Sequence, residues 1–210
     1  MDTITRKQKL SDSYKLMAAC FYEPEPALFT EEKVFQNLSR LITDLCPEAE
    51  INTEDMQQAL QKDNDVDLQV AHAELFIGPF ELKASPYGST YLEQGRRLMG
   101  DTTMEVLKHY RKAGLEIDVE QPPDHIAIEL EFVSHLYGLE AQALQDSDKE
   151  KASDLAQQRQ IFIQTYVRPW MPAFINNVRS GTEHAFYRSL ADCFEKFVRH
   201  MEGLEKPPAN

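Results

Sequence analysis

The stretch PPDHIAIELEFVSHLY, residues 122–137, is the clearest indicator of the fold. Two prolines restart the chain, and apolar side chains follow them at Ile126, Leu130, Val133 and Tyr137. Residues three or four apart lie on one face of an α-helix. We therefore expect a long amphipathic helix that begins just after the two prolines.

The same period of about 3.6 residues recurs along most of the chain. It predicts a first helix that begins after Thr30, has its apolar face within 34–45 and stops at Pro47. Further helices are expected at about 64–76, 102–113, 149–167, 170–178 and 183–202, with a short one after Thr53. We expect Thr30 to cap the first of these helices, Thr102 to begin a capping box, and Gly114 to end its helix in the left-handed conformation. No segment alternates polar and apolar residues. The expected fold is all-α, with about nine or ten helices packed into a single compact domain over residues 1–210.

The composition is that of a globular protein. The chain has 210 residues, 42% hydrophobic and 27% charged, which argues against a disordered, fibrous or membrane-embedded chain. It carries 22 basic and 35 acidic residues, a formal net charge of −13. Such a charge repels phosphate backbones, so we expect no nucleic-acid partner. It attracts basic partners at long range, although an acidic surface also serves solubility alone.

Cysteines and apolar runs bear on where the protein resides. Cys20, Cys46 and Cys193 are far apart and form no CxxC pair, which favours a reducing compartment over a disulfide framework or zinc site. The apolar stretch at 16–22 is too short for a secretory signal. No run of about eighteen apolar residues exists, so we expect no membrane insertion. The predicted location is the cytoplasm.

Common catalytic motifs are missing from the sequence, which contains no P-loop, GxGxxG, HExxH or GxSxG element. Glu131 and His135 are four residues apart, as are Glu105 and His109, and one helical turn puts each pair on one face. Helical di-iron proteins use Glu-x-x-His instead. A metal-dependent helical-bundle enzyme that uses Glu131 and His135 remains an alternative, beside a simple contact across one turn.

Two segments stand out from this helical background. One is SPYGSTY at 85–91, an aromatic loop with proline and glycine around its rings. The other begins with Asp124 and His125. Asp124 stands where a helix starts and can accept backbone N–H groups there, and His125 can titrate near neutral pH. Helix capping alone would also explain both residues.

The second segment resembles the signature E-x-x-P-D-H-[IV]-x-x-E-L-x-F of the TorD/DmsD/NarJ family of redox-enzyme maturation chaperones. This chain matches it with Glu120, Pro123, Asp124, His125, Ile126, Glu129, Leu130 and Phe132. The loop at 85–91 is similar to the family's P-[YW]-x-S-x-Y element. The segments 72–76 (HAELF) and 170–174 (WMPAF) resemble its Y-x-x-L-F and W-x-P-x-F elements. The four elements occur in the family's order.

This resemblance implies a single all-α domain and a function without catalysis. Members of the family bind the twin-arginine signal peptide of a molybdopterin oxidoreductase, of the dimethyl sulfoxide or trimethylamine N-oxide reductase type. They hold the apo form of that enzyme for cofactor insertion before export. The resemblance therefore implies a cytoplasmic chaperone that is not an enzyme and needs no cofactor of its own. A structural adaptor of the same fold is the further alternative.

The resemblance also assigns candidate residues for binding the signal peptide. These are Tyr22, Leu75, Phe76, Pro86, Tyr87, Gly100, Asp124 and His125, to which Glu129 is added as a second carboxylate for the basic part of the peptide. Because exposed ion pairs contribute only about 0.2–1 kcal/mol each, apolar contacts must supply much of the affinity. For Leu75 and Phe76, core packing is an equally good interpretation.

Two details remain open from the sequence. Gly88 and Thr90 replace the Glu and Val that the family often has in its P-Y-E-S-V-Y form, which leaves the client enzyme undetermined. The polar connection at 114–123 is a possible hinge through which C-terminal helices could exchange between chains. We therefore expect a monomer with a minor domain-swapped dimer.

Overall fold

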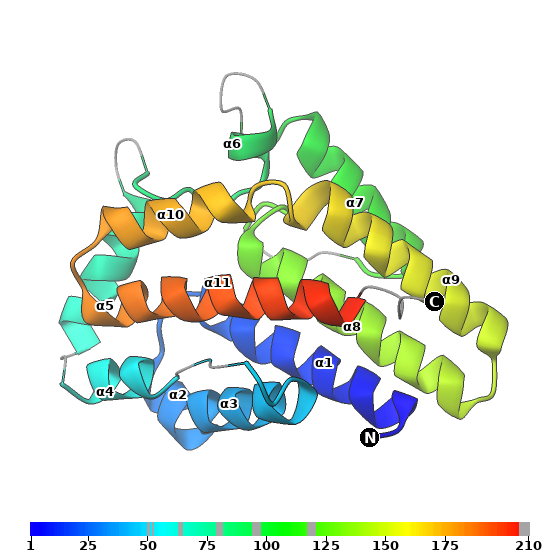
Figure 1. Ribbon diagram of the computed structural model, residues 1–210. Helices are drawn as coiled ribbons and strands as arrows, with labels where there is room; N and C mark the ends of the chain where they lie inside the picture. The colour runs from blue at the N-terminus through cyan, green and yellow to red at the C-terminus, as the bar shows by residue number, and fades with distance from the viewer. Residues whose placement is uncertain are drawn as a thin grey trace. The chain divides into compact units, whose positions relative to one another are not determined.

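The computed structural model describes residues 1–49, 51, 53–62, 65–78, 82–93, 98–116 and 121–205 (Figure 1). Within these ranges it contains eleven α-helices, two short π-helical segments and one isolated β-bridge, with no strand. The all-α prediction is confirmed. The helix count exceeds the predicted one because helices as short as α2 (Pro26–Glu31) and α6 (Ser89–Leu92) span too few turns to show a period.

The chain divides into two compact units. The first contains Met1–Phe21 and Pro86–Ala173, and the second contains Tyr22–Ser85 and Phe174–Asn210. The expectation of one domain with a hinge at 114–123 stays a prediction, and residues 117–120 of that hinge lie outside the described residues.

The first unit is built around one long helix, α8 (Ile126–Gln145). Its other helices are α1 (Thr3–Ala19), α6, α7 (Asp101–Lys112) and α9 (Lys149–Phe162), and α9 continues into the π-helical segment η2 (Ile163–Val167). Helix α1 runs antiparallel beside α8, as Figure 1 shows, since Ser11 bonds Ser134 and Lys7 bonds Glu140. Helix α9 packs against α8 as well.

A buried ionic cluster joins these three helices. The carboxylate of Glu140, 1% exposed, bonds Arg159 Nε at 2.5 Å and Lys7 Nζ at 2.6 Å. Both cations also lie over the ring of Tyr137, and the Arg159 guanidinium carbon is 4.0 Å from the ring centroid. The negative face of an aromatic ring attracts cations. The buried Glu140 carboxylate therefore has two cationic partners, and the Tyr137 ring adds a contact to both cations.

The second unit has an aromatic core. Its helices are α2, α3 (Val34–Leu45), α4 (Glu54–Lys62), α5 (Asp65–His72) with the π-helical segment η1 (Ala73–Ile77), and α11 (Ala185–Glu205). Helix α10 (Met171–Gly181) contains the boundary between the units. Phe29, Phe35 and Phe186 pack together with ring centroids about 5–6 Å apart. Helix α4 lies against α11.

The sequence predicted three helix ends, each at a single residue, and the structure confirms one of them. Gly114 has φ +81°, as predicted for the residue that ends α7. The Thr30 prediction is wrong, because Thr30 lies inside α2 and donates its hydroxyl to the Pro26 carbonyl at 3.0 Å. The Thr102 prediction is also wrong. Helix α7 begins one residue earlier, and the Glu93 carboxylate accepts the Thr102 N–H at 2.7 Å.

In the part of the chain that the structure describes, no helix is both long enough and apolar enough to cross a bilayer.

Candidate functional site

Residues 86–91 and the segment before α8 lie side by side in the first unit. Tyr87 and His125 form an isolated antiparallel bridge. On its two sides, the Gly88 N–H donates to the Asp124 carbonyl at 2.9 Å, and the Ile126 N–H donates to the Pro86 carbonyl at 2.8 Å. Two of the sequence elements that resemble the chaperone family therefore form one backbone-bonded structure.

Asp124 has a different role from the one predicted. It was expected to cap α8, but its Oδ2 instead accepts the N–H of Ser89, the first residue of α6, at 2.8 Å. His125 is the N-cap of α8, and its Nδ1 accepts the Ala127 N–H at 3.2 Å. A turn precedes α8, in which the His125 N–H donates to the Pro122 carbonyl. Asp124 lies within this turn, one residue before the N-cap position, and so does not cap α8.

Tyr87 is the partly exposed aromatic residue of the bridge. Its ring meets the His125 ring edge-on, with 5.5 Å between centroids, and its hydroxyl donates to Gln121 Oε1 at 2.8 Å. Partial burial raises the pKa of Tyr87, and the nearby charge of Asp124 adds to that effect. The phenol therefore stays protonated and acts as a hydrogen-bond donor.

Glu129 does not present a carboxylate at the surface, contrary to the expectation from sequence. Its side chain is 0% exposed, and neither carboxyl oxygen has a hydrogen-bond partner among the described residues. Burial raises its pKa well above the ordinary value, and Asp124 raises it further; the nearby Trp170 indole opposes this only weakly. The buried site thus favours the protonated form of Glu129, because a charged carboxylate would lose its hydration there.

Gly88 gives the loop its close fit over this buried acid. A Cβ added at Gly88 would lie 3.0 Å from Trp170 Nε1 and 3.3 Å from Glu129 Oε1. Trp170 is fixed in turn, since its indole N–H donates to the Tyr166 carbonyl in η2 and its ring stacks on Tyr91. Position 88 therefore has no space for the Glu side chain that the family often has there.

Pro86 and Gly100 also belong to the first unit, and both are buried. A Cβ added at Gly100 would lie 1.8 Å from Glu93 Oε2, so the missing side chain makes room for the carboxylate that caps α7. The other three predicted binding residues, Tyr22, Leu75 and Phe76, belong to the second unit. Their part in peptide binding stays a prediction.

Leu75 and Phe76 are packed inside that second unit. They are 0% and 4% exposed and lie in η1, where the Gly78 N–H reaches back five residues to the Ala73 carbonyl. Phe76 contacts the rings of Tyr187 and Phe174, with centroids 5.7 and 6.2 Å away. Core packing, one of the two interpretations held open from sequence, describes these two side chains.

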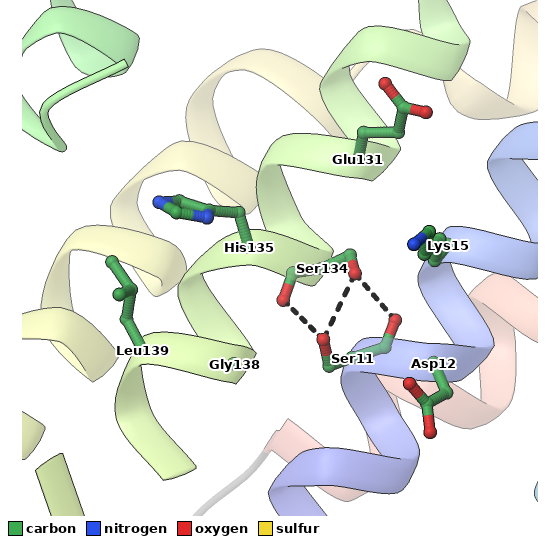
Figure 2. A pocket seen from close by; sticks show the side chains of 8 residues that line it. All are labelled: Ser11, Asp12, Lys15, Glu131, Ser134, His135, Gly138 and Leu139. Atoms are coloured by element: carbon green, nitrogen blue, oxygen red, sulfur yellow. Dashed lines mark hydrogen bonds between the residues drawn. The ribbon is translucent and has the colours of Figure 1, made fainter. Parts of the chain in front are cut away.

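A polar cleft lies between α1 and α8, also within the first unit (Figure 2). Its volume is about 420 Å³; α1 contributes Ser11, Asp12 and Lys15, and α8 contributes Glu131, Ser134, His135, Gly138 and Leu139. We call it the α1–α8 cleft. Ser11 and Ser134 bond each other's backbone carbonyls at 2.8 Å, which holds the two helices together beneath it.

An apolar hollow of about 220 Å³ adjoins the α1–α8 cleft. Glu131 and His135 line both, and the apolar walls come from Tyr110, Leu115 and the α8 residues Ile128 and Phe132. Desolvation lowers the pKa of His135, so its ring is neutral at pH 7, and its Nε2 is buried with no hydrogen-bond partner among the residues described. The sequence drew attention to Glu131 and His135 only as a possible metal pair.

The described residues contain no group of three or more His, Cys, Asp or Glu side chains arranged to hold a metal ion. Glu131 and His135 are thus neighbours in a cleft. The alternative of a helical metalloenzyme has no further ligand in this part of the chain to support it.

Comparison with known proteins gives a consistent result. The family model for the nitrate reductase delta subunit matches residues 43–176. The chain is 29% identical over 149 residues to a chaperone protein TorD from Vibrio parahaemolyticus, covering 69% of this chain and 68% of that one. It is 28% identical to a chaperone protein TorD from Salmonella paratyphi B, covering 70% of this chain and 64% of the relative.

Among solved structures, the chain resembles a redox enzyme maturation protein from Archaeoglobus fulgidus. The TM-score is 0.56 at 25% sequence identity, over 90% of this chain and 93% of the other. These relatives are named as chaperones and a maturation protein rather than as catalysts.

Proposed function

The chain belongs to the nitrate reductase delta subunit family, the group of TorD and NarJ proteins that its motifs resemble, and from this membership we propose that it is a maturation chaperone. It acts in the cytoplasm on the apo form of a molybdopterin oxidoreductase, of the dimethyl sulfoxide or trimethylamine N-oxide reductase type. It binds the twin-arginine signal peptide of that client and holds the client for cofactor insertion before export. It makes and breaks no covalent bond.

The observation that carries this proposal is the bridge between Tyr87 and His125. Residues 86–91 and 121–126 come from distant parts of the chain, yet four hydrogen bonds hold them together. A loop fixed in this way loses little conformational entropy when a peptide binds, which favours affinity. The half-exposed Tyr87 ring supplies an aromatic contact surface.

Charge supports the same proposal. A net charge of −13 speeds the encounter with a cationic leader peptide at low ionic strength. The apolar middle of such a peptide then needs an apolar surface, because burial contributes roughly 25 cal/mol per Å² removed from water.

Calorimetric titration with a synthetic twin-arginine signal peptide tests the proposal. We expect the wild-type chain to bind it, and Tyr87→Ala to weaken binding by about tenfold, the effect of roughly 1.4 kcal/mol. Asp124→Ala should also weaken binding, because it releases α6 and the loop that carries Tyr87 from the segment before α8. Both variants must keep the helical circular dichroism of the wild type. Unchanged affinity in both would refute the assignment of this site.

The structural-adaptor alternative makes a different prediction for cell extracts. A maturation chaperone should co-purify with a molybdoenzyme from anaerobically grown cells. Recovery of no molybdoenzyme, together with no binding of the signal peptide, would favour the adaptor.

A further inference from the structure

The α1–α8 cleft and the site around Tyr87 are connected by a continuous set of residues in the first unit. Tyr110 links them, since its hydroxyl donates to the Pro123 carbonyl at 2.8 Å and its ring lines the apolar hollow. The hollow then shares Glu131 and His135 with the cleft. The Tyr87 structure, the apolar hollow and the α1–α8 cleft are therefore neighbours in the first unit.

The charges of the cleft favour a cation. Asp12 and Glu131 are both exposed acidic residues, whereas Lys15 is the one basic residue among the described residues that line the cleft. In Figure 2, Asp12 and Lys15 project from α1 on one side and Glu131 and His135 from α8 on the other. The neutral His135 ring adds no opposing charge.

The spacing suits a short peptide segment. Helix α8 rises 1.5 Å per residue, so Glu131 lies about 7.5 Å along the axis from Ile126, the residue that is bonded to Pro86. An extended peptide covers about 3.3–3.6 Å per residue. At least two or three peptide residues are therefore needed for the step from the Tyr87 structure to Glu131, because Ile126 and Glu131 also point in different directions around α8.

We infer that the α1–α8 cleft receives the arginine side chains of the signal peptide, with Glu131 and Asp12 as their anionic partners. The inference rests on the proposed function and assigns the basic part of the ligand to residues outside the loop at 85–91. It also transfers the role expected of Glu129 to Glu131. Glu129 is sealed from solvent, whereas Glu131, two residues later, faces the cleft.

The decisive experiment compares two peptides. One is a synthetic twin-arginine leader, and the other is the same peptide with both arginines replaced by glutamine. For the twin-arginine peptide, Glu131→Gln should weaken binding about three- to tenfold, and Asp12→Asn should act in the same direction. Neither substitution should change the affinity for the glutamine peptide, because the lost ion pairs are absent from it.

Lys15→Met provides a test of opposite sign. Removing the ammonium group from the cleft should tighten binding of the twin-arginine peptide about two- to fivefold, since a like charge is removed. Glu150→Gln is the matched control for overall charge, because Glu150 is an exposed residue of α9 that lines neither the cleft nor the hollow. It should leave both affinities within error of the wild type.

The outcomes separate the two proposals. If the folded wild type binds neither peptide, the proposed function fails and this inference fails with it. If the twin-arginine peptide binds but Glu131→Gln behaves like Glu150→Gln, the cleft assignment is overturned while the proposed function stands. A loss with Glu131→Gln and a gain with Lys15→Met, both confined to the twin-arginine peptide, support the assignment.

Discussion

The backbone N–H of Ser89 donates a 2.8 Å hydrogen bond to Oδ2 of Asp124, thirty-five residues further along the chain. Both residues are fully buried. A carboxylate at the first turn of a helix satisfies N–H groups that have no partner within the helix. Asp124 thus attaches the short helix α6, and with it the loop that carries Tyr87, to the segment that starts α8.

Asp124→Ala should lower the free energy of unfolding by about 1–3 kcal/mol, because it leaves a buried N–H without an acceptor. Urea denaturation monitored by circular dichroism measures this loss. The matched control is Asp148→Ala, which removes an exposed cap whose Oδ1 accepts the Lys151 N–H at 3.0 Å. The control should also cost stability, about 0.5–2 kcal/mol, but should leave peptide affinity intact. Equal stability of Asp124→Ala and the wild type would show that this bond contributes nothing.

Glu129→Gln should flatten the dependence of stability on pH. Because the folded-state pKa of Glu129 is raised, the native protein holds a proton that the unfolded chain releases above its ordinary pKa of 4.5. Its contribution to stability is complete below that value and is lost as pH rises towards the folded pKa, by up to about 1.4 kcal/mol per pH unit.

The glutamine variant lacks this loss, so its stability relative to the wild type should increase from pH 5 to pH 8. Urea midpoints measured across that range test the prediction. Glu150→Gln, at an exposed position, should follow the wild type. Parallel curves for the wild type and Glu129→Gln would mean that Glu129 titrates normally.

Gly100→Ala should destabilise the chain by displacing the Glu93 carboxylate from the start of α7. The added methyl group would overlap that carboxylate, which can swing away only by giving up its bond to the Thr102 N–H. We expect a loss of about 1 kcal/mol, the typical value of a helix cap. In a Glu93→Ala background the same substitution should cost little, so a double-mutant cycle of unfolding free energies should be non-additive.

Glu140→Ala should be among the most damaging single substitutions in the first unit. It leaves the buried Arg159 without its 2.5 Å partner, and breaking a buried pair typically costs 3–5 kcal/mol. Thermal and urea unfolding should both report the loss. By contrast, Glu105→Ala breaks an exposed pair with Lys108 and should change stability by about 0–1 kcal/mol. Similar losses for the two substitutions would mean that the buried ionic cluster contributes no more to stability than the exposed pair.

The connection at 114–123 leads to a prediction about assembly. We expect a monomer with a small fraction of domain-swapped dimer, which should grow after partial unfolding at high concentration. Size-exclusion chromatography with light scattering measures both species. A single monomer peak under every condition would count against the exchange.

The helices were predictable because their apolar periodicity is local. Helix α8 illustrates this, since its stripe from Ile126 to Tyr137 can be read without knowledge of any other segment. The helix ends were less predictable. Thr102 looked like a cap from its neighbours, but the acceptor at that position is the carboxylate of Glu93, which the sequence alone does not bring there.

The sequence motifs predicted only part of the site. They placed Tyr87, Asp124 and His125 in one site, and the bridge brings these residues together. They did not predict that Glu129 is sealed beneath Gly88, because a carboxylate within an otherwise apolar turn can face either the core or solvent. The α1–α8 cleft depends on the pairing of Ser11 with Ser134. That contact joins distant parts of the chain, so no local pattern could indicate it.

The wide turn at η2 has a consequence for how this protein can evolve. In this segment the Arg168 N–H reaches back five residues to Ile163, so the turn absorbs one residue more than an ordinary helical turn. A deletion of one residue within 163–167 would restore the ordinary turn while the flanking residues keep their directions. A deletion of one residue can therefore be accommodated here without moving Trp170 away from Gly88.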